Sequence, residues 1–88
     1  MKIVLIGAGR RSFGRGQVND ILQADDLRGR GVILSLVDEN AEALATMRAY
    51  AKRVRDHLGV DVRLESTTDR AEALPRADFV ITAVERKR

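Results

Sequence analysis

The sequence predicts an α/β domain in which four parallel strands form one sheet of order 3-2-1-4, with helices on its faces. Three observations lead to this prediction. Short apolar runs alternate with helical segments along the chain. The runs IVLI, VILSLV and FVITAV are continuous, as is typical of parallel strands buried on both faces. The glycine-rich stretch GAGRRSFGRG separates the first run from the first helical segment.

The first strand is expected over Lys2–Ile6, a β-prone run that ends at a glycine. A helix is expected over about Ser12–Ala24, because three apolar residues share one side of it: Val18, Ile21 and Leu22. The polar loop DDLRGRG then leads to the second strand, Val32–Val37.

The clearest helix lies between Asn40, a suitable N-cap, and Gly59, a suitable stop. Its apolar residues are spaced by three and four positions: Leu44, Met47, Ala51, Val54 and Leu58. The third strand is expected over Val60–Leu64, where apolar and polar residues alternate.

The last part of the chain predicts a short helix and a fourth strand. Asp69 and Glu72 have the spacing of a capping box, and Pro75 closes the helix that they begin. The fourth strand follows Asp78 and covers Phe79–Val84. Strands separated by helices favour parallel pairing with right-handed crossovers. Four strands alternating with three helices predict the first half of a doubly wound, Rossmann-like dinucleotide-binding fold, with residues 1–88 as one domain.

Composition narrows the function classes. The chain of 88 residues has no cysteine, which excludes disulfides and thiolate metal sites and fits a cytoplasmic protein. No apolar run reaches the roughly 18–20 residues of a membrane helix, and the start MKIVLI is too short for a signal peptide. Thirteen arginines fit nucleic-acid contact, but most lie beside acidic residues at helical spacing, and the aromatic residues are few: Phe13, Tyr50 and Phe79. We therefore expect no membrane or nucleic-acid partner.

The segment Gly7-Ala8-Gly9 predicts a phosphate-binding turn, because it lies between a strand and a helix. The first glycine permits the tight turn, and the second brings backbone N–H groups close to a pyrophosphate. The helix that follows directs its positive end towards the anion. Ser12 occupies the place of the usual third glycine, and three neighbours complete the candidate cofactor-binding segment: Arg10, Arg11 and Phe13.

Gly14 and Gly16 follow inside the predicted helix, where each glycine costs about 1 kcal/mol relative to alanine. A close approach to the first strand or to a ligand explains such glycines. The alternative is that all the glycines serve only a strand-to-helix turn and its packing.

Asp38 ends the run VILSLVD and is the second candidate cofactor-binding element. An acidic residue at the end of the second strand accepts hydrogen bonds from the adenosine ribose hydroxyls and repels a 2′-phosphate. This favours NAD over NADP. The alternative role for Asp38 is to cap the next helix, for which Asn40 competes. The third element, Thr82-Ala83, lies at the end of the fourth strand, where small residues leave room for the dinucleotide.

Three stretches together resemble the N-terminal segment of glycoside hydrolase family 4: MKIVLIGAGRRSFGRG, LVDEN and ADFVITAVERKR. The resemblance covers essentially the whole chain. Members of this family are NAD- and manganese-dependent α-glucosidases, 6-phospho-glucosidases and α-galacturonidases. The family commonly has serine where this chain has Arg10, which removes a hydroxyl hydrogen bond and supplies a group that neutralises phosphate.

The resemblance implies glycosidic-bond hydrolysis by redox-elimination, outside the usual two-carboxylate mechanism. NAD oxidises carbon 3 of the sugar, a base removes the neighbouring proton, Mn²⁺ stabilises the enediolate, and the glycosidic oxygen leaves. Water then adds and the hydride returns. The implied metal ligands, Cys and His, and the implied Tyr base lie beyond this sequence. No catalytic or metal-binding role is therefore assigned to His57 or Tyr50, and we expect sugar binding and activity only in the full-length protein.

Two other interpretations are consistent with the residues. The first is the cofactor domain of a malate- or lactate-dehydrogenase-like oxidoreductase, which shares the topology. The second is a non-enzymatic binding or oligomerisation module, or an engineered minimal fold. In every case a fourth strand without a further neighbour leaves a free sheet edge, which predicts self-association moderated by the basic tail ERKR.

Overall fold

The computed structural model describes residues 1–9, 11–27 and 29–82, and for residues 11–13 it describes the backbone alone. The elements follow in the predicted order: β1 (Lys2–Ile6), α1 (Arg11–Gln23), the 3-10 turn η1 (Asp25–Leu27), β2 (Val32–Val37), α2 (Ala41–Leu58), β3 (Val62–Thr67), α3 (Arg70–Ala73) and β4 (Phe79–Thr82). No helix in these ranges is both long and apolar enough to cross a bilayer.

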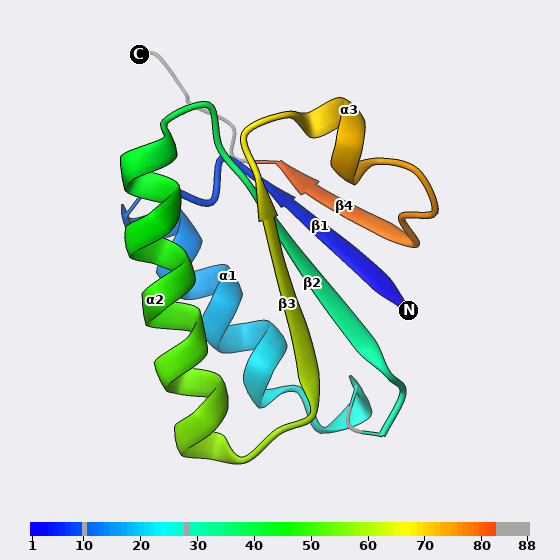
Figure 1. Cartoon of the computed structure of the whole chain (residues 1–88). Coiled ribbons are helices and arrows are strands. Elements are labelled where there is room, and N and C mark those ends of the chain that lie inside the picture. Colours follow the sequence, from blue (N-terminus) through cyan, green and yellow to red (C-terminus); the bar gives the residue numbers. More distant parts are fainter. Residues whose placement is uncertain (10, 28, 83–88) are drawn as a thin grey trace, which may run out of the picture.

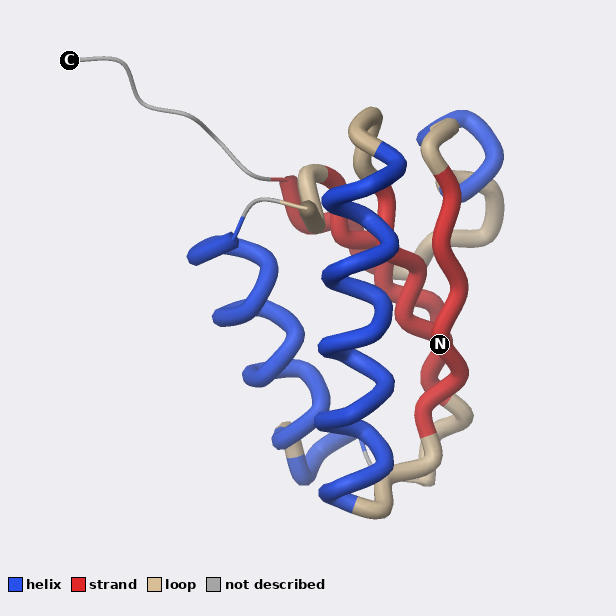
Figure 2. The backbone as a smooth tube through the Cα atoms, turned by 60° about the vertical axis from the view of Figure 1, so that its left-hand side comes forward, coloured by secondary structure: helices blue, strands red, loops and turns tan. Residues whose placement is uncertain are grey.

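The four strands form one parallel sheet with the order β3-β2-β1-β4, as predicted (Figure 1). The two long helices lie together on one face, and α3 lies on the other (Figure 2). Right-handed crossovers explain this arrangement. The chain moves outward from β1 to β2 to β3, which places α1 and α2 on the same face, and then crosses back to β4, which places α3 on the opposite face.

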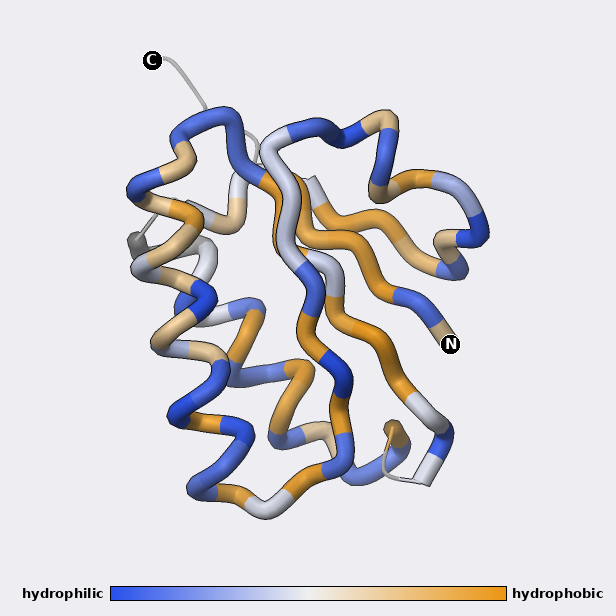
Figure 3. Tube along the Cα trace, viewed as in Figure 1, coloured by the Kyte–Doolittle hydropathy of each residue, from blue (hydrophilic) through white to orange (hydrophobic). Residues whose placement is uncertain are grey.

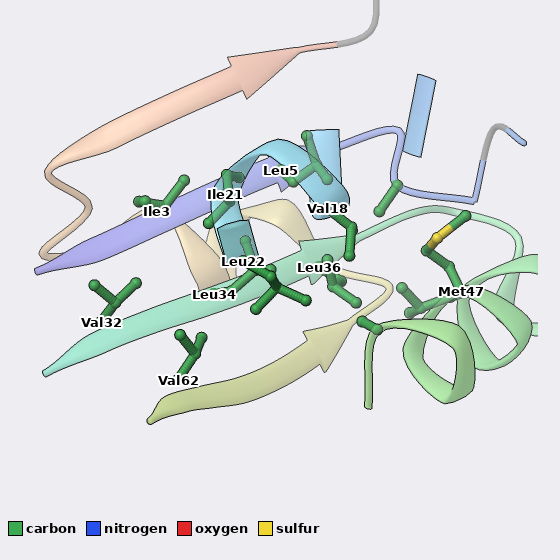
Figure 4. Close-up of a cluster of buried hydrophobic side chains, with 13 residues drawn as sticks. Ile3, Leu5, Val18, Ile21, Leu22, Val32, Leu34, Leu36, Met47 and Val62 are labelled. Carbon is green, nitrogen blue, oxygen red and sulfur yellow. The ribbon is translucent and has the colours of Figure 1, made fainter. Parts of the chain in front are cut away.

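The main core lies between the sheet and the two long helices (Figure 4). Leu5, Leu34 and Leu36 of the central strands are fully buried there. Val4 and Val37 point to the other face, where they pack with Ala73 of α3. Burial on both faces confirms the prediction drawn from the continuous apolar runs of β1 and β2.

The boundary predicted for the third strand was wrong. The strand begins at Val62 instead of Val60, because the Val60 N–H donates to the Arg55 carbonyl as part of the α2 C-terminus. It continues to Thr67, because each residue from Val62 onward pairs in parallel register with β2. The predicted polar loop DDLRGRG also contains a helical turn, η1.

Both predicted caps of α2 are confirmed. The Asn40 side chain accepts a hydrogen bond from the Ala43 N–H, and Gly59 adopts the left-handed conformation with φ 67°. At α3 only half of the capping box forms. Asp69 caps the helix, but the Glu72 carboxylate accepts from the Thr67 hydroxyl instead of reaching back to the cap.

β4 differs from the expected strand buried on both faces. Phe79 is 56% exposed and Val80 is 47% exposed, and nearby Leu74 is 40% exposed. Figure 3 shows that apolar residues continue along this outer strand. The reason is position, because β4 is the last strand on its side of the described sheet. The expected end at Val84 lies outside the described residues.

The turn between α3 and β4 holds a non-glycine residue in a glycine conformation. Pro75 and Arg76 are the central residues, the Ala77 N–H donates to the Leu74 carbonyl, and Arg76 has φ 65°. A turn of this kind favours glycine at its second central position.

We therefore expect Arg76→Gly to raise the free energy of unfolding by about 0.5–1 kcal/mol, after the entropy of the unfolded glycine is set against the relieved strain. Urea unfolding followed by circular dichroism measures the effect. Arg76→Ala is the control, because it removes the same charge and keeps the Cβ. Equal stability of the two variants contradicts the backbone explanation.

Candidate functional site

A cleft of about 580 Å³ opens at the carboxyl ends of β1, β2 and β3. These strand ends lie in the upper part of Figure 1. Three connections line it: the one after β1, the one between β2 and α2, and the one between β3 and α3. In open parallel sheets, ligands bind at this carboxyl edge. The lining residues are Ile6, Gly7, Val37, Asp38, Glu39, Asn40, Thr68, Asp69 and Arg70.

The predicted phosphate-binding turn is anchored to the end of β2. The N–H groups of Gly7 and Ala8 both donate to the Val37 carbonyl, at 2.8 and 3.0 Å. Gly7 has φ 84°, a conformation that L side chains rarely adopt, so the tight turn depends on this glycine. Ala8 is fully buried under the turn. The turn is thus held in place by the fold itself.

Asp38 connects the glycine turn to the start of α2. Its Oδ2 atom accepts a hydrogen bond from the Gly9 N–H at 2.8 Å, and its Oδ1 atom accepts from the Asn40 N–H at 2.9 Å. A Cβ on Gly9 would lie 2.7 Å from Asp38 Oδ2 and 2.8 Å from the Ala43 Cβ. Gly9 therefore makes room for the carboxylate, in addition to the role at a pyrophosphate that the sequence predicts.

The structure identifies Gly14 as the glycine at which α1 meets the turn. A Cβ there would lie 2.2 Å from the Ala8 carbonyl oxygen and 2.8 Å from Met47 Cε. This contact, at the turn that follows the first strand, agrees with the close approach that the sequence predicts for the helix glycines. Gly16 has open space around it, so no approach within the described chain accounts for it.

The structure brings some of the predicted cofactor-binding residues together. Gly7 and Asp38 line the same cleft, with Ala8 and Gly9 in the turn beside them. Arg11, Ser12 and Phe13 begin α1, and nothing is described of their side chains. Arg10 and Ala83 lie outside the described residues.

Thr82 is not among the residues that line this cleft. It pairs with Ile6 on the β4 side of β1, whereas the cleft extends from β1 towards β3. The described cleft is therefore lined by elements on one side of the glycine turn only, the side of β2 and β3.

One wall of the cleft was not predicted from the sequence. Thr68, Asp69 and Arg70 follow β3, and Asp69 was recognised only as a cap. Glu39 and Asn40 on the β2 side also line the cleft without having been predicted as site residues. The signal was available, because the predicted strand order places the carboxyl end of β3 beside that of β2.

A metal site is not found in the part of the chain that the structure describes, where no three His, Cys, Asp or Glu side chains gather closely enough. The described residues thus do not fit the Mn²⁺ that the family resemblance implies.

Tyr50 has a packing role, because its hydroxyl donates to Asn19 Oδ1 at 3.0 Å and the Arg15 guanidinium lies 5.4 Å from its ring centroid.

The parallel order β3-β2-β1-β4, with a glycine turn after β1 and an acidic residue after β2, defines a Rossmann-like α/β domain. A family model described as family 4 glycosyl hydrolase matches residues 2–86. The chain therefore belongs to the family 4 glycosyl hydrolases, and it corresponds to their N-terminal segment. This assignment confirms the family resemblance found in the sequence.

Curated relatives are much longer than this chain. An alpha-glucosidase of Erwinia rhapontici is 42% identical over 84 residues, which are 96% of this chain and 18% of the relative. An alpha-galactosidase of Rhizobium meliloti (strain 1021) is 34% identical over 83 residues, 94% of this chain and 16% of the relative. A probable 6-phospho-beta-glucosidase of Bacillus subtilis (strain 168) is 35% identical over 82 residues, 93% of this chain and 19% of the relative. The chain thus spans less than a fifth of these relatives.

A solved structure shows the same fold. The crystal structure of a 6-phospho-alpha-glucosidase from gut microorganisms, in complex with NAD and Mn²⁺, aligns with a TM-score of 0.79 at 20% sequence identity. The alignment covers 94% of this chain and 18% of that one.

Proposed function

We propose that residues 1–88 form the NAD-binding domain of a longer family 4 glycosyl hydrolase, and that the cleft holds the adenosine half of the cofactor. The position of Asp38 carries this proposal. Its carboxylate lines the cleft and is held by the backbone of the glycine turn and of the start of α2. A fixed carboxylate at the end of β2 is the group that accepts hydrogen bonds from the ribose hydroxyls.

The residues of this chain supply orientation and charge. The Gly7-Ala8-Gly9 turn, whose own N–H groups bond to Val37 and Asp38, places the start of α1 next to the position of the pyrophosphate. A helix N-terminus stabilises negative charge there. Asp38 sets the position of the ribose and disfavours a 2′-phosphate by charge repulsion. Bound NAD supplies the hydride acceptor for oxidation of the sugar. We propose no catalytic residue and no metal ligand within this chain.

Two observations favour this role over the other interpretations. The family match favours a glycosyl hydrolase over a malate- or lactate-dehydrogenase-like oxidoreductase. The relative of known structure contains NAD, which favours a cofactor domain over a module without a ligand.

Calorimetric titration of the 88-residue chain with NAD, NADP and ADP-ribose tests the proposal. We expect saturable binding of NAD in the range of about 10 μM to 1 mM, where about 4–7 kcal/mol of binding free energy is available. ADP-ribose should bind about as well as NAD, because it retains the adenosine and pyrophosphate, and NADP should bind more weakly. The absence of saturable NAD binding by a chain that circular dichroism shows to be folded refutes the proposal.

We further infer that the 88-residue chain self-associates through β4, with a second copy as the partner. The large apolar side chains that are exposed in the described structure gather on this strand and the turn before it: Leu74, Phe79 and Val80. β4 also has a neighbour on one side only within the described sheet. In a dimer with a two-fold axis, the two β4 edges pair antiparallel, and the exposed apolar side chains of the two copies lie at the same interface.

Sedimentation velocity at protein concentrations of about 5 to 500 μM should show a shift from monomer to dimer. We expect weak association, because an interface formed by two short edge strands is small. Val80→Lys should keep the chain monomeric, because the charge lies at the proposed interface. Ala45→Lys on the exposed side of α2 adds the same charge elsewhere and should leave the dimer unchanged. A chain that is monomeric throughout, or equal effects of both variants, contradicts the inference.

A further inference from the structure

Arg70 is the only cationic residue among those that line the described cleft. Arg70 follows β3 as the first residue of α3. It therefore belongs to the β3 wall of the cleft, and Asp38 lies between this wall and the glycine turn. The order β3-β2-β1-β4 requires this placement, because β2, which carries Asp38, lies between β1 and β3.

The Arg70 side chain is exposed and, among the described residues, makes no hydrogen bond or ion pair. Its neighbour Asp69 caps α3, where Oδ1 accepts from the Ala71 N–H at 2.9 Å. Arg70 therefore has its guanidinium available to a ligand.

The cleft has no aromatic residue on which a purine base could stack. If the pyrophosphate lies at the turn after β1 and the ribose at Asp38, the rest of the cleft, towards the end of β3, would hold the base. The planar guanidinium of arginine stacks on aromatic faces, and it is the planar, cationic group on this wall. We propose that Arg70 stacks on the adenine base of bound NAD and so contributes to affinity for the adenosine half. This inference rests on the NAD-binding function proposed above.

An arginine near the adenosine ribose can instead bind the 2′-phosphate of NADP. The charges of this cleft favour stacking. Asp38, Glu39 and Asp69 surround the same space, and three carboxylates repel a phosphate dianion. An adenine ring is neutral and meets no such repulsion.

The test compares the affinities of Arg70→Ala and Arg70→Lys with that of the unmodified chain, by calorimetry with NAD, nicotinamide hypoxanthine dinucleotide and NADP. We expect Arg70→Ala to bind NAD about fivefold more weakly, the usual size of a cation–π contact. Arg70→Ala should weaken binding of the hypoxanthine analogue by the same factor, because stacking does not depend on the exocyclic amine of adenine. Arg70→Lys should recover only part of the loss, because lysine keeps the charge and lacks the plane.

Arg63→Ala is the matched control. Arg63 lies in β3, is 75% exposed in its side chain, pairs with Glu65 at 3.7 Å and is not part of the cleft. Arg63→Ala removes one positive charge, as Arg70→Ala does, and should leave NAD affinity unchanged.

Each result has one meaning. If the unmodified, folded chain does not bind NAD, the proposed function fails and this inference fails with it. If NAD binds and an Asp38 variant weakens it while Arg70→Ala does not, only the role of Arg70 is refuted. A loss of NADP affinity larger than the loss of NAD affinity also overturns stacking, in favour of a phosphate contact.

Discussion

Gly14→Ala is expected to lower the free energy of unfolding by about 3 kcal/mol, at the upper end of the usual cost of overpacking. The added methyl group would lie 2.2 Å from the Ala8 carbonyl oxygen. That oxygen belongs to the backbone of a fully buried residue, so it cannot move without shifting the turn. The Met47 side chain, 2.8 Å from the new Cβ, is flexible and is able to move aside at lower cost.

Gly16→Ala is the matched control, two positions further along the same helix. Its Cβ would meet nothing within 4 Å, and the position is exposed. Alanine should therefore stabilise the helix by about 1 kcal/mol. Urea unfolding monitored by circular dichroism measures both variants. Similar effects of the two substitutions would mean that α1 does not approach the turn at Gly14 as described.

Asp38→Asn is expected to weaken NAD binding at least tenfold, or by about 1.4 kcal/mol or more. A neutral amide replaces the charged acceptor of the ribose hydroxyls, and its NH₂ group faces a backbone N–H that previously donated to the carboxylate. The same substitution should reduce the preference for NAD over NADP, because it removes the charge that repels the 2′-phosphate.

Glu42→Gln controls for the loss of one negative charge. Glu42 lies in the first turn of α2, is exposed and is not among the residues that line the cleft. The NAD affinity of the Glu42→Gln variant should match that of the unmodified chain. Because Asp38 also holds the glycine turn, each titration is made on protein whose far-ultraviolet circular dichroism shows full folding. An Asp38→Asn variant that is folded and binds NAD normally would remove the main support for the proposed site.

These two expectations concern different levels of the same site. Gly14 determines how closely α1 approaches the turn, and Asp38 determines how the turn is joined to the second strand. A change at Gly14 should therefore act first on stability, whereas a change at Asp38 should act first on the ligand. Measuring stability and NAD affinity for both variants separates the two roles.

Much of the fold was determined by local sequence patterns. The bounds of β1 and β2 were predicted correctly, because continuous apolar runs end at a glycine in one case and an aspartate in the other. The ends of α2 followed from Asn40 and Gly59, whose side-chain acceptor and left-handed backbone act within a few residues. The sheet order followed from the dinucleotide-binding fold that the alternation of strands and helices indicates.

Only the tertiary structure decided which residues share the candidate site. The sequence indicates the glycine turn and Asp38 separately, but their hydrogen bond joins positions 29 residues apart. The wall formed by Thr68, Asp69 and Arg70 and the tight contact at Gly14 likewise depend on how helices and strands pack. Local patterns determine backbone conformation through neighbouring residues, whereas distances between elements are set by the packing of the whole sheet and its helices. For that reason the sequence determined the fold and its glycine turn, and the folded chain determined the cleft.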